Sequence, residues 1–356
     1  MKIKSLKIKG FRNFDEGEFN PCDGINIIYG QNAQGKTNLI EAVWLFTGAK
    51  SFRGAKDNEL KKFNSENTVL EAVFEIEGVE KQAKITIDNR RKAFLNGKPL
   101  SAASALAGNF YAIVFSPVDL GLVRDGPRER RRFIDTAIGQ IYPKYITCLK
   151  AYSRAITQRN AALKEAAKTK NVNNPLFSAF EAEICENGKK IINYRLRYLE
   201  KITPFLTEIY SSLTGKREKL EIKYINSLQG IDFAQYLVNS RKNDMLCGMT
   251  SAGPHRDDIE FNINGINARS FGSQGQMRSI ALCLKLAEAQ VIKDITGEFP
   301  IALLDDVMSE LDPNRQEYIL NHISGWQVII TCCEPDVINR LRKGKCIKVE
   351  KGRLTQ

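Results

Sequence analysis

Eight consecutive residues near the start of the sequence have the types and spacing of a phosphate-binding loop. They match the pattern G-x-x-x-x-G-K-[ST] in full: Gly30, Gln31, Asn32, Ala33, Gln34, Gly35, Lys36 and Thr37. The glycines let the backbone curl so that several N–H groups face one cavity, next to the positive end of a following helix. In such a loop Lys36 reaches the β- and γ-phosphates of ATP, and the Thr37 hydroxyl ligates Mg²⁺. The pattern therefore predicts a site for ATP and magnesium.

Two adjacent carboxylates follow an apolar run much later in the chain. Because four apolar residues precede Asp305 and Asp306, both carboxylates should lie at the end of a buried strand. We expect Asp305 to hold the magnesium ion and Asp306 to orient or deprotonate the attacking water. The predicted catalytic residues are then Lys36 and Asp306, and the predicted metal ligands are Thr37 and Asp305. Taken alone, two aspartates after a strand are as often a helix cap.

The elements that must position these residues alternate between strands and helices. Apolar and alternating runs predict strands at residues 2–9, 24–29, 69–76, 83–87, 111–115, 259–263, 301–304 and 328–330. Helical periodicity appears at residues 36–46, 127–168, 176–213 and 274–293 and after Pro313. Buried strands that alternate with helices indicate a largely parallel sheet. The predicted fold class is α/β, a P-loop ATPase head with an inserted helical second domain.

Near residue 126 the sequence pattern changes from strand-like runs to helical periodicity, and this change divides the chain. Residues 1–125 are predicted to form the first part of the head, with the phosphate-binding loop, and residues 219–356 the second part, with the acidic pair. Residues 126–218 are predicted to be a helical insertion domain, with a polar breaker at 169–175. This helical hairpin is far too short for a long coiled-coil arm.

Positive charge is concentrated in the middle of the chain. The 356 residues have a net charge of +12, with 43% hydrophobic and 26% charged residues, which is typical of a globular protein. Residues 121–220 hold 20 Lys/Arg and 10 Asp/Glu, so nearly the whole excess lies there. Such an uneven load predicts a nucleic-acid surface. A solvated basic helix face is the alternative.

The remaining composition points to a reduced, cytoplasmic protein. The eight cysteines include no C-x-x-C pair, and with only His255 and His322 beside them a zinc site is not expected. No apolar run approaches the roughly 18 to 20 residues of a membrane helix. The basic N-terminus leads into an alternating strand rather than the apolar stretch of a signal peptide.

Two further motifs frame the acidic pair. One is Ser273, Gln274, Gly275 and Gln276, at the start of a predicted helix, and the other is Ser309, Glu310, Leu311 and Asp312. The first resembles the signature motif of ABC-type ATPases and the second their D-loop. The order of loop, insertion, signature, acidic pair and D-loop is that of the SMC-like branch. In that family the signature completes the nucleotide site of the opposite subunit, so the resemblance implies a homodimer in which Ser273, Gly275 and Gln276 contact the other chain's ATP.

Three longer segments extend the resemblance over essentially the whole chain. Residues 6–14, 126–135 and 253–258 look like the RecF family of recombination-repair proteins, as does the short helical insertion. The family implies a bacterial, weak DNA-dependent ATPase of recombinational repair, replication restart and the SOS response. It would bind gapped or double-stranded DNA as an ATP-induced dimer and help load recombinase onto single-stranded DNA. The implied partners are the RecR and RecO mediators.

Some positions depart from the wider ABC pattern. Asp306 stands where most members carry glutamate, Cys332 stands in place of the switch histidine, and no clear Q-loop glutamine follows residues 111–115. We therefore expect slow hydrolysis. An ATPase subunit of a transporter would share the loop and signature, but not the basic insertion or the long separation of Thr37 from Asp305. An SMC-like tether would need sustained heptads.

Other residues allow two interpretations each. His255 could sense phosphate or be structural. Arg12 and Asn13 could approach the nucleotide on family resemblance alone. The basic run could touch DNA or pack against the head: Arg128, Arg130, Arg131 and Arg132.

Overall fold

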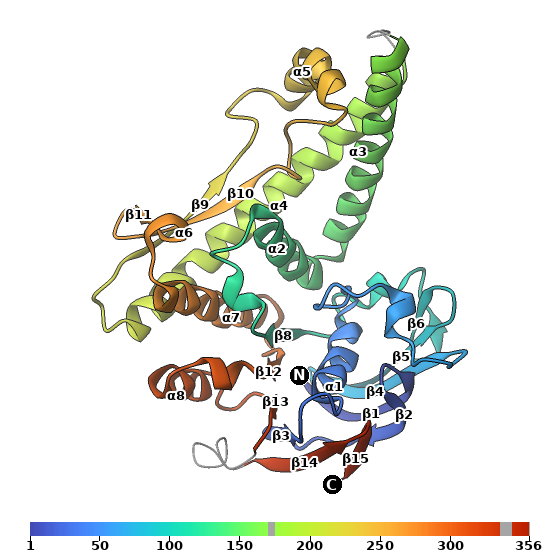
Figure 1. Cartoon of the computed structure of the whole chain (residues 1–356), viewed down its shortest axis with the longest axis vertical. Helices are drawn as coiled ribbons and strands as arrows, with labels where there is room; N and C mark the ends of the chain where they lie inside the picture. The colour runs from blue at the N-terminus through green and yellow to red at the C-terminus, as the bar shows by residue number, and fades with distance from the viewer. Residues whose placement is uncertain (170–174, 335–343, 356) are drawn as a thin grey trace.

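The computed structural model describes residues 1–169, 175–334 and 344–355. They form an α/β head with a helical lobe that projects from it (Figure 1). Most of the breaker predicted at 169–175, namely residues 170–174, lies outside the described residues. In the described part, no helix has the length and apolar character needed to cross a membrane.

The nucleotide-loop strand lies inside a six-stranded sheet with the order β15-β14-β3-β13-β12-β8. The strands are β3 (Ile25–Tyr29), β8 (Ala112–Phe115), β12 (Ile301–Asp305), β13 (Val328–Cys332), β14 (Lys345–Glu350) and β15 (Arg353–Thr355). All neighbours are parallel except the β14–β15 hairpin. The predicted parallel sheet is confirmed. Because its strands share one direction, the residues after β3, β12 and β13 meet at the same edge.

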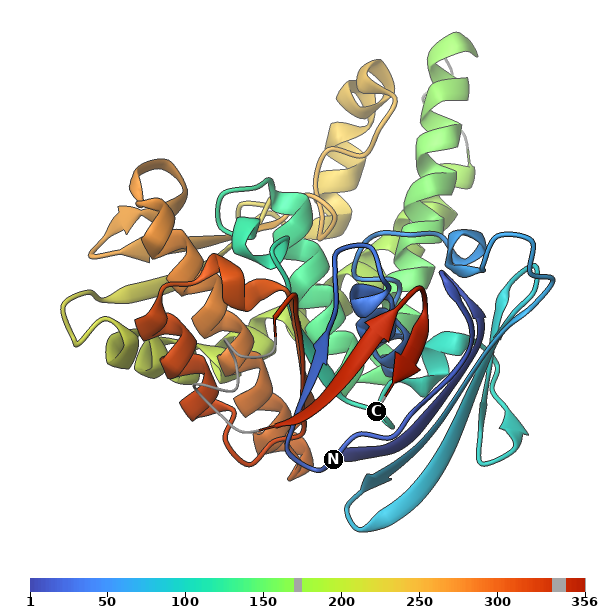
Figure 2. The same ribbon diagram turned by 60° about the horizontal axis from the view of Figure 1, so that its bottom comes forward.

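A second, antiparallel sheet has the order β2-β1-β4-β5-β6-β7. Its strands are β1 (Lys2–Phe11), β2 (Phe14–Phe19), β4 (Thr68–Ile76), β5 (Val79–Ile87), β6 (Arg91–Leu95) and β7 (Lys98–Pro99). It curves along one side of the head, and α1 (Lys36–Trp44) lies between it and the parallel sheet (Figure 2). Alternate residues of β4 are buried, and β1 follows the same alternation from Leu6 to Lys9, after a register shift between Ile3 and Ser5.

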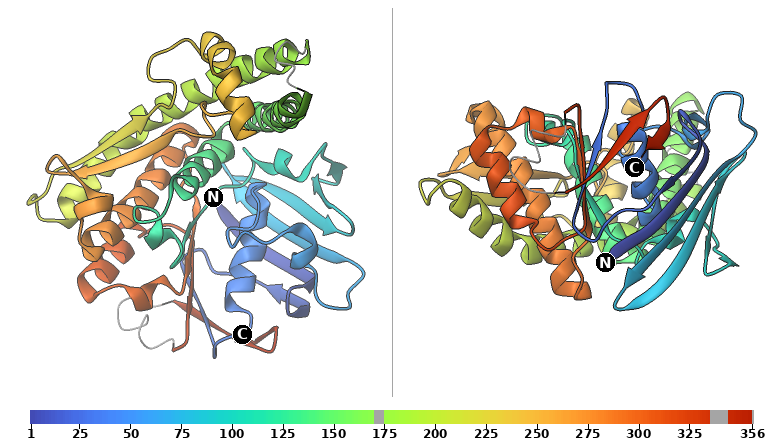
Figure 3. Two further views of the ribbon diagram at one scale, coloured as in Figure 1. Left: turned by 45° about the horizontal axis from the view of Figure 1, so that its top comes forward. Right: turned by 90° about the horizontal axis from the view of Figure 1, so that it is seen from below.

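The lobe is built on an antiparallel pair of long helices, α3 (Pro143–Thr169) and α4 (Leu176–Leu213), with α2 (Pro127–Ile141) at its base (Figure 3, left). α4 has the predicted bounds. The helix predicted over 127–168 is instead two helices, because Tyr142 leaves the helical conformation and Pro143 starts α3. Helix α5 (Phe233–Cys247) packs on α3 and α4, and a small sheet joins β9 (Leu220–Ile225), β10 (Asp258–Ile263) and β11 (Ile266–Asn267).

Helix α7 (Gln274–Thr296) connects the two parts of the molecule. It packs along α4 of the lobe and against β8 of the head, and it runs slightly beyond its predicted end. The remaining elements are α6 (Ala268–Phe271), α8 (Pro313–His322) and 3₁₀ segments at Leu45–Thr47, Asp57–Leu60, Ala103–Leu106, Asp119–Gly121 and Val307–Glu310. The start of α7 is therefore linked mechanically to the lobe.

Buried ion pairs hold the lobe together. Arg159 has no exposed surface, and its guanidinium lies 2.7 Å from Asp244 and 3.2 Å from Glu181. Arg195, which is 2% exposed, pairs with Asp135 at 2.8 Å. A buried charge without its partner is strongly destabilising. These arginines are therefore structural, although they belong to the basic segment.

The basic run of α2 is also mainly structural. Arg130 is 2% exposed and forms a two-point ion pair with Asp258, at 2.7 and 2.9 Å. Arg131 donates to the carbonyl of Asp257, and Arg132 donates to the carbonyls of Ser51 and Phe52. All three arginines therefore have partners within the protein: Arg130 is buried, whereas Arg131 and Arg132 are partly exposed, and Arg132 packs against the head. Arg128 is exposed.

His255 belongs to the lobe. Its Nδ1 atom lies 2.6 Å from the Tyr152 hydroxyl and its Nε2 atom lies 3.1 Å from the Thr250 carbonyl. The pKa of His255 is lowered to about 4, mainly by burial. The hydrogen bond to the Thr250 backbone raises the pKa, whereas the nearby Arg256 and Arg131 lower it. The structural interpretation of His255 fits this environment.

We expect the lobe to lose stability as the pH falls from 7 to 5. The folded-state pKa of His255 lies below the unfolded value of about 6.5, so the unfolded chain takes up the proton first. Because His255 stays neutral in the folded protein, the free energy of unfolding falls by about 2 kcal/mol over this range. Urea unfolding followed by circular dichroism should show a steeper pH dependence for the parent than for His255→Gln. Parallel curves for the two proteins would contradict this account.

Candidate nucleotide-binding site

The loop after β3 has the backbone that its glycines predict. Gly30 and Gly35 adopt φ of 149° and 117°. A Cβ at Gly30 would lie 2.3 Å from the Val349 carbonyl oxygen, and one at Gly35 would lie 2.7 Å from the Asn13 side chain. Only glycine fits both places. Gly35 is the N-cap of α1, and no side chain among the described residues caps that helix end, so its N–H groups remain for an anion.

The Lys36 ammonium lies inside the curl of this loop. It donates to the carbonyls of Gly30 at 2.7 Å and Gln31 at 3.1 Å, and the residue is 6% exposed. Gln31, Asn32 and Ala33 are exposed above it. The loop and its lysine therefore form one concave positive surface, whose N–H groups and ammonium fit a phosphate chain.

The structure brings Thr37 and Asp305 together, although 268 positions separate them. The Thr37 hydroxyl donates to Asp305 Oδ1 at 2.9 Å, and the Thr331 hydroxyl donates to the same oxygen at 3.1 Å. Asp305 is 6% exposed, and its burial raises the pKa of the carboxyl. Among the described residues no Lys or Arg forms an ion pair with it. A buried carboxylate beside a hydroxyl, with no cationic partner, fits Mg²⁺, which prefers such oxygen ligands.

Asp306 differs from its neighbour in both backbone and exposure. Its φ of 54° lies in the left-handed region, which is uncommon outside glycine and costs energy. The Thr331 hydroxyl accepts its backbone N–H at 2.9 Å, and the Asp306 carbonyl accepts from Ser309 at 2.7 Å. Its carboxylate is only partly buried. Thr331 thus binds both aspartates and fixes their relation, a role that the sequence analysis missed.

The thiol beside the loop belongs to Cys333 rather than Cys332. Cys333 is exposed; its Sγ lies 3.3 Å from Asn32 Oδ1 and 3.9 Å from Lys36 Nζ. Cys332 is the last residue of β13 and packs against the core, where burial raises its pKa to about 12. Sequence analysis placed Cys332 at the position of the switch histidine. In the structure the side chain that reaches the loop comes one residue later.

Residues before and after the loop hold it in place. The Asn13 amide donates to the Gln34 carbonyl at 2.7 Å. The β14–β15 hairpin adds two bonds, from Lys351 N to Gln34 Oε1 at 2.6 Å and from Gly352 N to the Gln34 carbonyl at 3.0 Å. Figure 2 shows this hairpin, in red, beside the strand that leads into the loop. Asn13 therefore supports the backbone of the loop.

Arg12 lies next to this support and pairs with α1. Its guanidinium lies 2.8 Å and 3.0 Å from the two carboxylate oxygens of Glu41, which is fully buried. The Ser51 hydroxyl also donates to Glu41. These contacts fix Arg12 to the helix that follows the loop.

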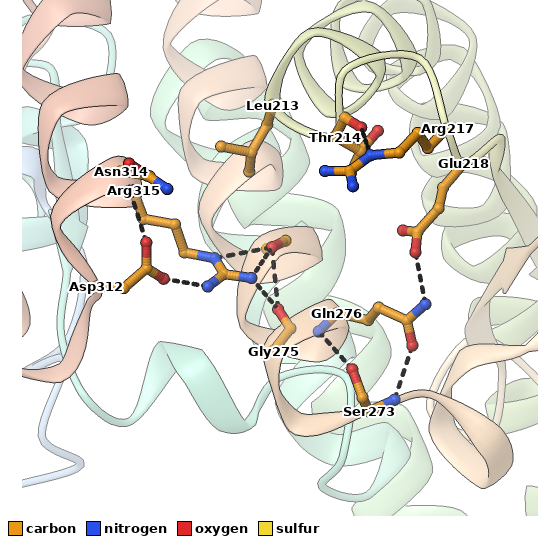
Figure 4. Close-up of a pocket in the computed structure, with 11 residues that line it drawn as sticks. Leu213, Thr214, Arg217, Glu218, Ser273, Gly275, Gln276, Asp312, Asn314 and Arg315 are labelled. Carbon is orange, nitrogen blue, oxygen red and sulfur yellow. Dashed lines mark hydrogen bonds and ion pairs between the residues drawn. The ribbon is translucent and has the colours of Figure 1, made fainter.

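The signature residues start α7. Ser273 Oγ accepts from the backbone N–H of Gln276 at 3.2 Å, and Gln276 Oε1 accepts from the backbone N–H of Ser273 at 2.8 Å. This reciprocal pair is a capping box. The Gln276 amide also donates to Glu218 at 2.7 Å, and Glu218 accepts from the Tyr210 hydroxyl at 2.5 Å (Figure 4). The end of α4 therefore sets the position of the signature.

A pocket of about 390 Å³ opens beside the signature. Arg315 crosses one wall, donating to Ser279 Oγ at 2.9 Å and to the Gly275 carbonyl at 3.0 Å (Figure 4). The remaining lining includes Arg217, Glu218 and Asn314, and none of it comes from residues 30–37. Loop, Thr37 and acidic pair thus converge in one chain, whereas Ser273, Gly275 and Gln276 lie elsewhere.

The D-loop residues lie between these two regions. Arg278 of α7 donates to the Glu310 carbonyl at 3.1 Å and pairs with its carboxylate at 3.4 Å. Asp312 caps α8 by accepting from the backbone N–H of Arg315 at 3.1 Å. Contacts of Arg278 with Glu310 therefore connect the segment after the acidic pair with the signature helix.

Comparison with known proteins agrees with this arrangement. A family model described as the RecF/RecN/SMC N-terminal domain matches residues 2–355. The chain is 38% identical over 360 residues to the DNA replication and repair protein RecF of Agathobacter rectalis, with 99% of each chain covered. The solved structure of the recombination mediator protein RecF-ATP in the RecFOR pathway superposes with a TM-score of 0.91 and 34% identity, over 99% of this chain and 97% of that one.

A more distant structure shows the shared fold. The Smc head domain of Pyrococcus furiosus has a TM-score of 0.54 at 17% identity. The predicted α/β ATPase head with a helical insert is thereby confirmed. From the family model and the 38% identical relative together, we conclude that the chain belongs to the RecF family of DNA replication and repair proteins, with the ATP-binding head of the RecF and SMC group.

Proposed function

We propose that this protein is an ATP-driven switch that binds double-stranded or gapped DNA as a dimer and helps to load recombinase onto single-stranded DNA. One observation carries the dimer: within a single chain the phosphate-binding loop and the signature are both formed but lie apart. Ser273, Gly275 and Gln276 are then free to contact a nucleotide held by a second chain. Two apposed sites of this kind give an interface with two-fold symmetry.

Each site divides its tasks among residues of the loop and the acidic pair. Residues 30–35 surround the phosphates with backbone N–H groups, and Lys36 neutralises the β- and γ-phosphates. Thr37 and Asp305 hold Mg²⁺, which supplies charge neutralisation at the phosphate oxygens. Asp306 orients the attacking water. These assignments are supported by the 2.9 Å contact between Thr37 and Asp305.

Hydrolysis in this site should be slow. Aspartate is one methylene shorter than the usual glutamate, so the carboxylate of Asp306 reaches less far toward the attacking water, and a misplacement of about 1 Å can cost roughly 100-fold in rate. A thiol, Cys333, lies beside Lys36 instead of an imidazole. A slow ATPase keeps the ATP-bound dimer long enough to act as a switch.

The pathway partners follow from the relatives. A solved relative is named as a recombination mediator of the RecFOR pathway, which supports RecO and RecR as partners here. The sequence divides the chain into head parts at 1–125 and 219–356 around a lobe at 126–218, and we propose a larger lobe. The contacts of β9 with α4, of β10 with α2 and of α5 with α3 and α4 support adding residues 220–267 to it, so that the second head part begins near α7.

A single substitution tests the dimer. Ser273→Arg should leave ATP binding by the separate chain nearly intact, because the loop is distant, but should prevent ATP-driven dimerisation. Light scattering with ATP and Mg²⁺ measures the mass, and Ser101→Arg, an exposed serine in the loop after β7, is the matched control. Equal dimer yields for Ser273→Arg and the control would contradict the proposed interface.

A further inference from the structure

Most cations of the basic segment already have partners inside the protein. The pairs of Arg130, Arg159 and Arg195 are buried. On the surface of the lobe Lys189 pairs with Asp232 and Lys190 pairs with Glu186. The segment as a whole is therefore not a uniform basic surface, and the candidate partner surface must lie where cations remain unpaired.

One face of α3 carries such cations. Positions 150, 154, 157, 161, 164 and 168 recur at alternating steps of four and three, which places them on one side of a helix. All six are exposed. The buried residues of α3 lie on the opposite side, against the rest of the lobe: Tyr145, Tyr152, Ala155, Arg159, Leu163 and Ala166.

Four of the six exposed positions are basic: Lys150, Arg154, Lys164 and Lys168. We call these four residues the α3 ridge. Among the residues that the structure describes, no carboxylate forms an ion pair with Lys150, Arg154 or Lys164. Lys150 donates to the neutral Ser104 hydroxyl at 2.6 Å, and Lys168 pairs with Glu165 at 3.4 Å with both side chains mostly exposed. Exposed pairs of this kind are weak.

The length of the α3 ridge matches a nucleic-acid backbone. At 1.5 Å per residue, Lys150 to Lys168 spans about 27 Å. Duplex DNA presents roughly 16 phosphates over that length. Figure 1 shows α3 along an outer edge of the lobe, and the four cations remain exposed although Lys150 reaches Ser104 of the head. The ridge is thus long, straight and accessible.

We propose that the α3 ridge is the surface through which the lobe contacts the phosphate backbone of double-stranded DNA. This rests on the proposed function as a DNA-binding protein and adds the place of contact. The other two positions of the face, Thr157 and Ala161, are small, so a backbone can approach closely. Cations that contact phosphates carry no sequence information, so we expect this contact to be independent of the DNA sequence.

The same face suits a protein or a membrane less well. Protein interfaces have an apolar or aromatic centre, and helices that lie on membranes carry a large apolar face opposite the charged one. The exposed face of α3 has no large apolar side chain, because its other members are Thr157 and Ala161. The basic face of α3 can therefore recognise a partner by charge complementarity alone. DNA is the partner with the densest array of negative charge.

The test measures the salt dependence of DNA binding. The variant Lys150→Gln, Arg154→Gln, Lys164→Gln and Lys168→Gln removes four charges from the α3 ridge. The matched control removes four charges from lysines on the surface of the head, exposed or partly exposed, that are already paired with carboxylates: Lys4→Gln, Lys9→Gln, Lys84→Gln and Lys92→Gln. Fluorescence anisotropy of a labelled 30-base-pair duplex, with ATP and Mg²⁺, gives the affinity from 50 to 200 mM salt.

We expect the magnitude of the slope of log K against log salt to fall by about 3.6 for the ridge variant, since each of the four lost phosphate contacts contributes about 0.9. The control should keep the parental slope, and both variants should keep the circular dichroism and ATP affinity of the parent. If the parent binds DNA and the ridge variant keeps the parental slope, the proposal that the α3 ridge contacts DNA is wrong, whereas the proposed function stands. A parent that binds no duplex with ATP overturns the proposed function as well. Equal losses in both variants would indicate a general effect of net charge and also overturn the ridge. If DNA binding is unchanged but the ridge variant loses binding to an acidic partner protein, the surface serves that partner instead.

Discussion

Replacing Asp306 with asparagine should stop ATP hydrolysis and leave Mg-ATP bound. The carboxylate that orients the water is lost, and removal of a general base typically costs 10²- to 10⁴-fold in rate, so turnover should fall by at least about 100-fold. Asp306 is only partly buried and lies outside the Thr37–Asp305 contact. Binding should therefore persist, and the ATP dimer should accumulate because hydrolysis releases it. Phosphate release and the lifetime of the dimer are the measurements.

The neighbouring substitution is the control, because it makes the same chemical change one residue away. Asp305→Asn removes the charge from the buried carboxylate that accepts from Thr37 and Thr331. Mg-ATP affinity should fall and the chain should remain largely monomeric. Titration calorimetry distinguishes the two variants directly. If Asp306→Asn turns over ATP at the parental rate, another group activates the water and our assignment of Asp306 is wrong.

Lys36→Ala should abolish productive ATP binding. Its ammonium is the only cation inside the curl of the loop in the part of the chain that the structure describes, and phosphate contacts to such a charge are the strongest in the site. Cys333 gives a direct readout, since its exposed thiol lies 3.9 Å from the ammonium. ATP with Mg²⁺ should protect Cys333 from a maleimide in the parent. In Lys36→Ala the rate at which the maleimide labels Cys333 should be the same with and without ATP.

Two internal references make that experiment specific. Cys247, exposed at the end of α5 in the lobe, should react at one rate under all conditions. Lys50 is exposed and lies outside the loop, so in Lys50→Ala ATP should still protect Cys333. Protection that survives in Lys36→Ala would show that nucleotide binds without the lysine, or that it binds elsewhere.

Local patterns correctly predicted that the phosphate-binding loop and Asp305 are neighbours in space. The loop follows β3 and Asp305 ends β12, and in a parallel sheet these two ends must share an edge. The contact of Thr37 with Asp305 follows from this topology. The same rule could have suggested the role of Thr331, because it is the penultimate residue of β13, which lies between those two strands. Thr331 is not part of a recognisable sequence motif, however, so the sequence alone does not single it out.

Positions that depend on distant partners could not be predicted. Arg130 and Asp258 are 128 positions apart, and Arg195 binds Asp135 across the lobe. Their charges count toward the basic excess of the sequence, yet they are neutralised by partners that only the fold brings near. A reversal of charge at Arg195 would therefore test stability rather than DNA binding. The thiol beside the loop depends on the direction of each side chain: side chains alternate along a strand, and Cys332 packs against the core while Cys333 reaches Lys36.

The position of β3 between β13 and β14 has a consequence for how the protein is made. The antiparallel sheet pairs strands that are close in sequence, so residues up to about 99 can assemble early. The neighbours of β3 emerge from the ribosome roughly 300 residues after it, which at 5 to 20 residues per second is on the order of 15 to 60 s. During that time the apolar strand Ile25–Tyr29 has no sheet to join. A nascent chain halted before Val328 therefore displays a complete phosphate-binding sequence that is unable to hold ATP, and its unpaired strand is a target for chaperones.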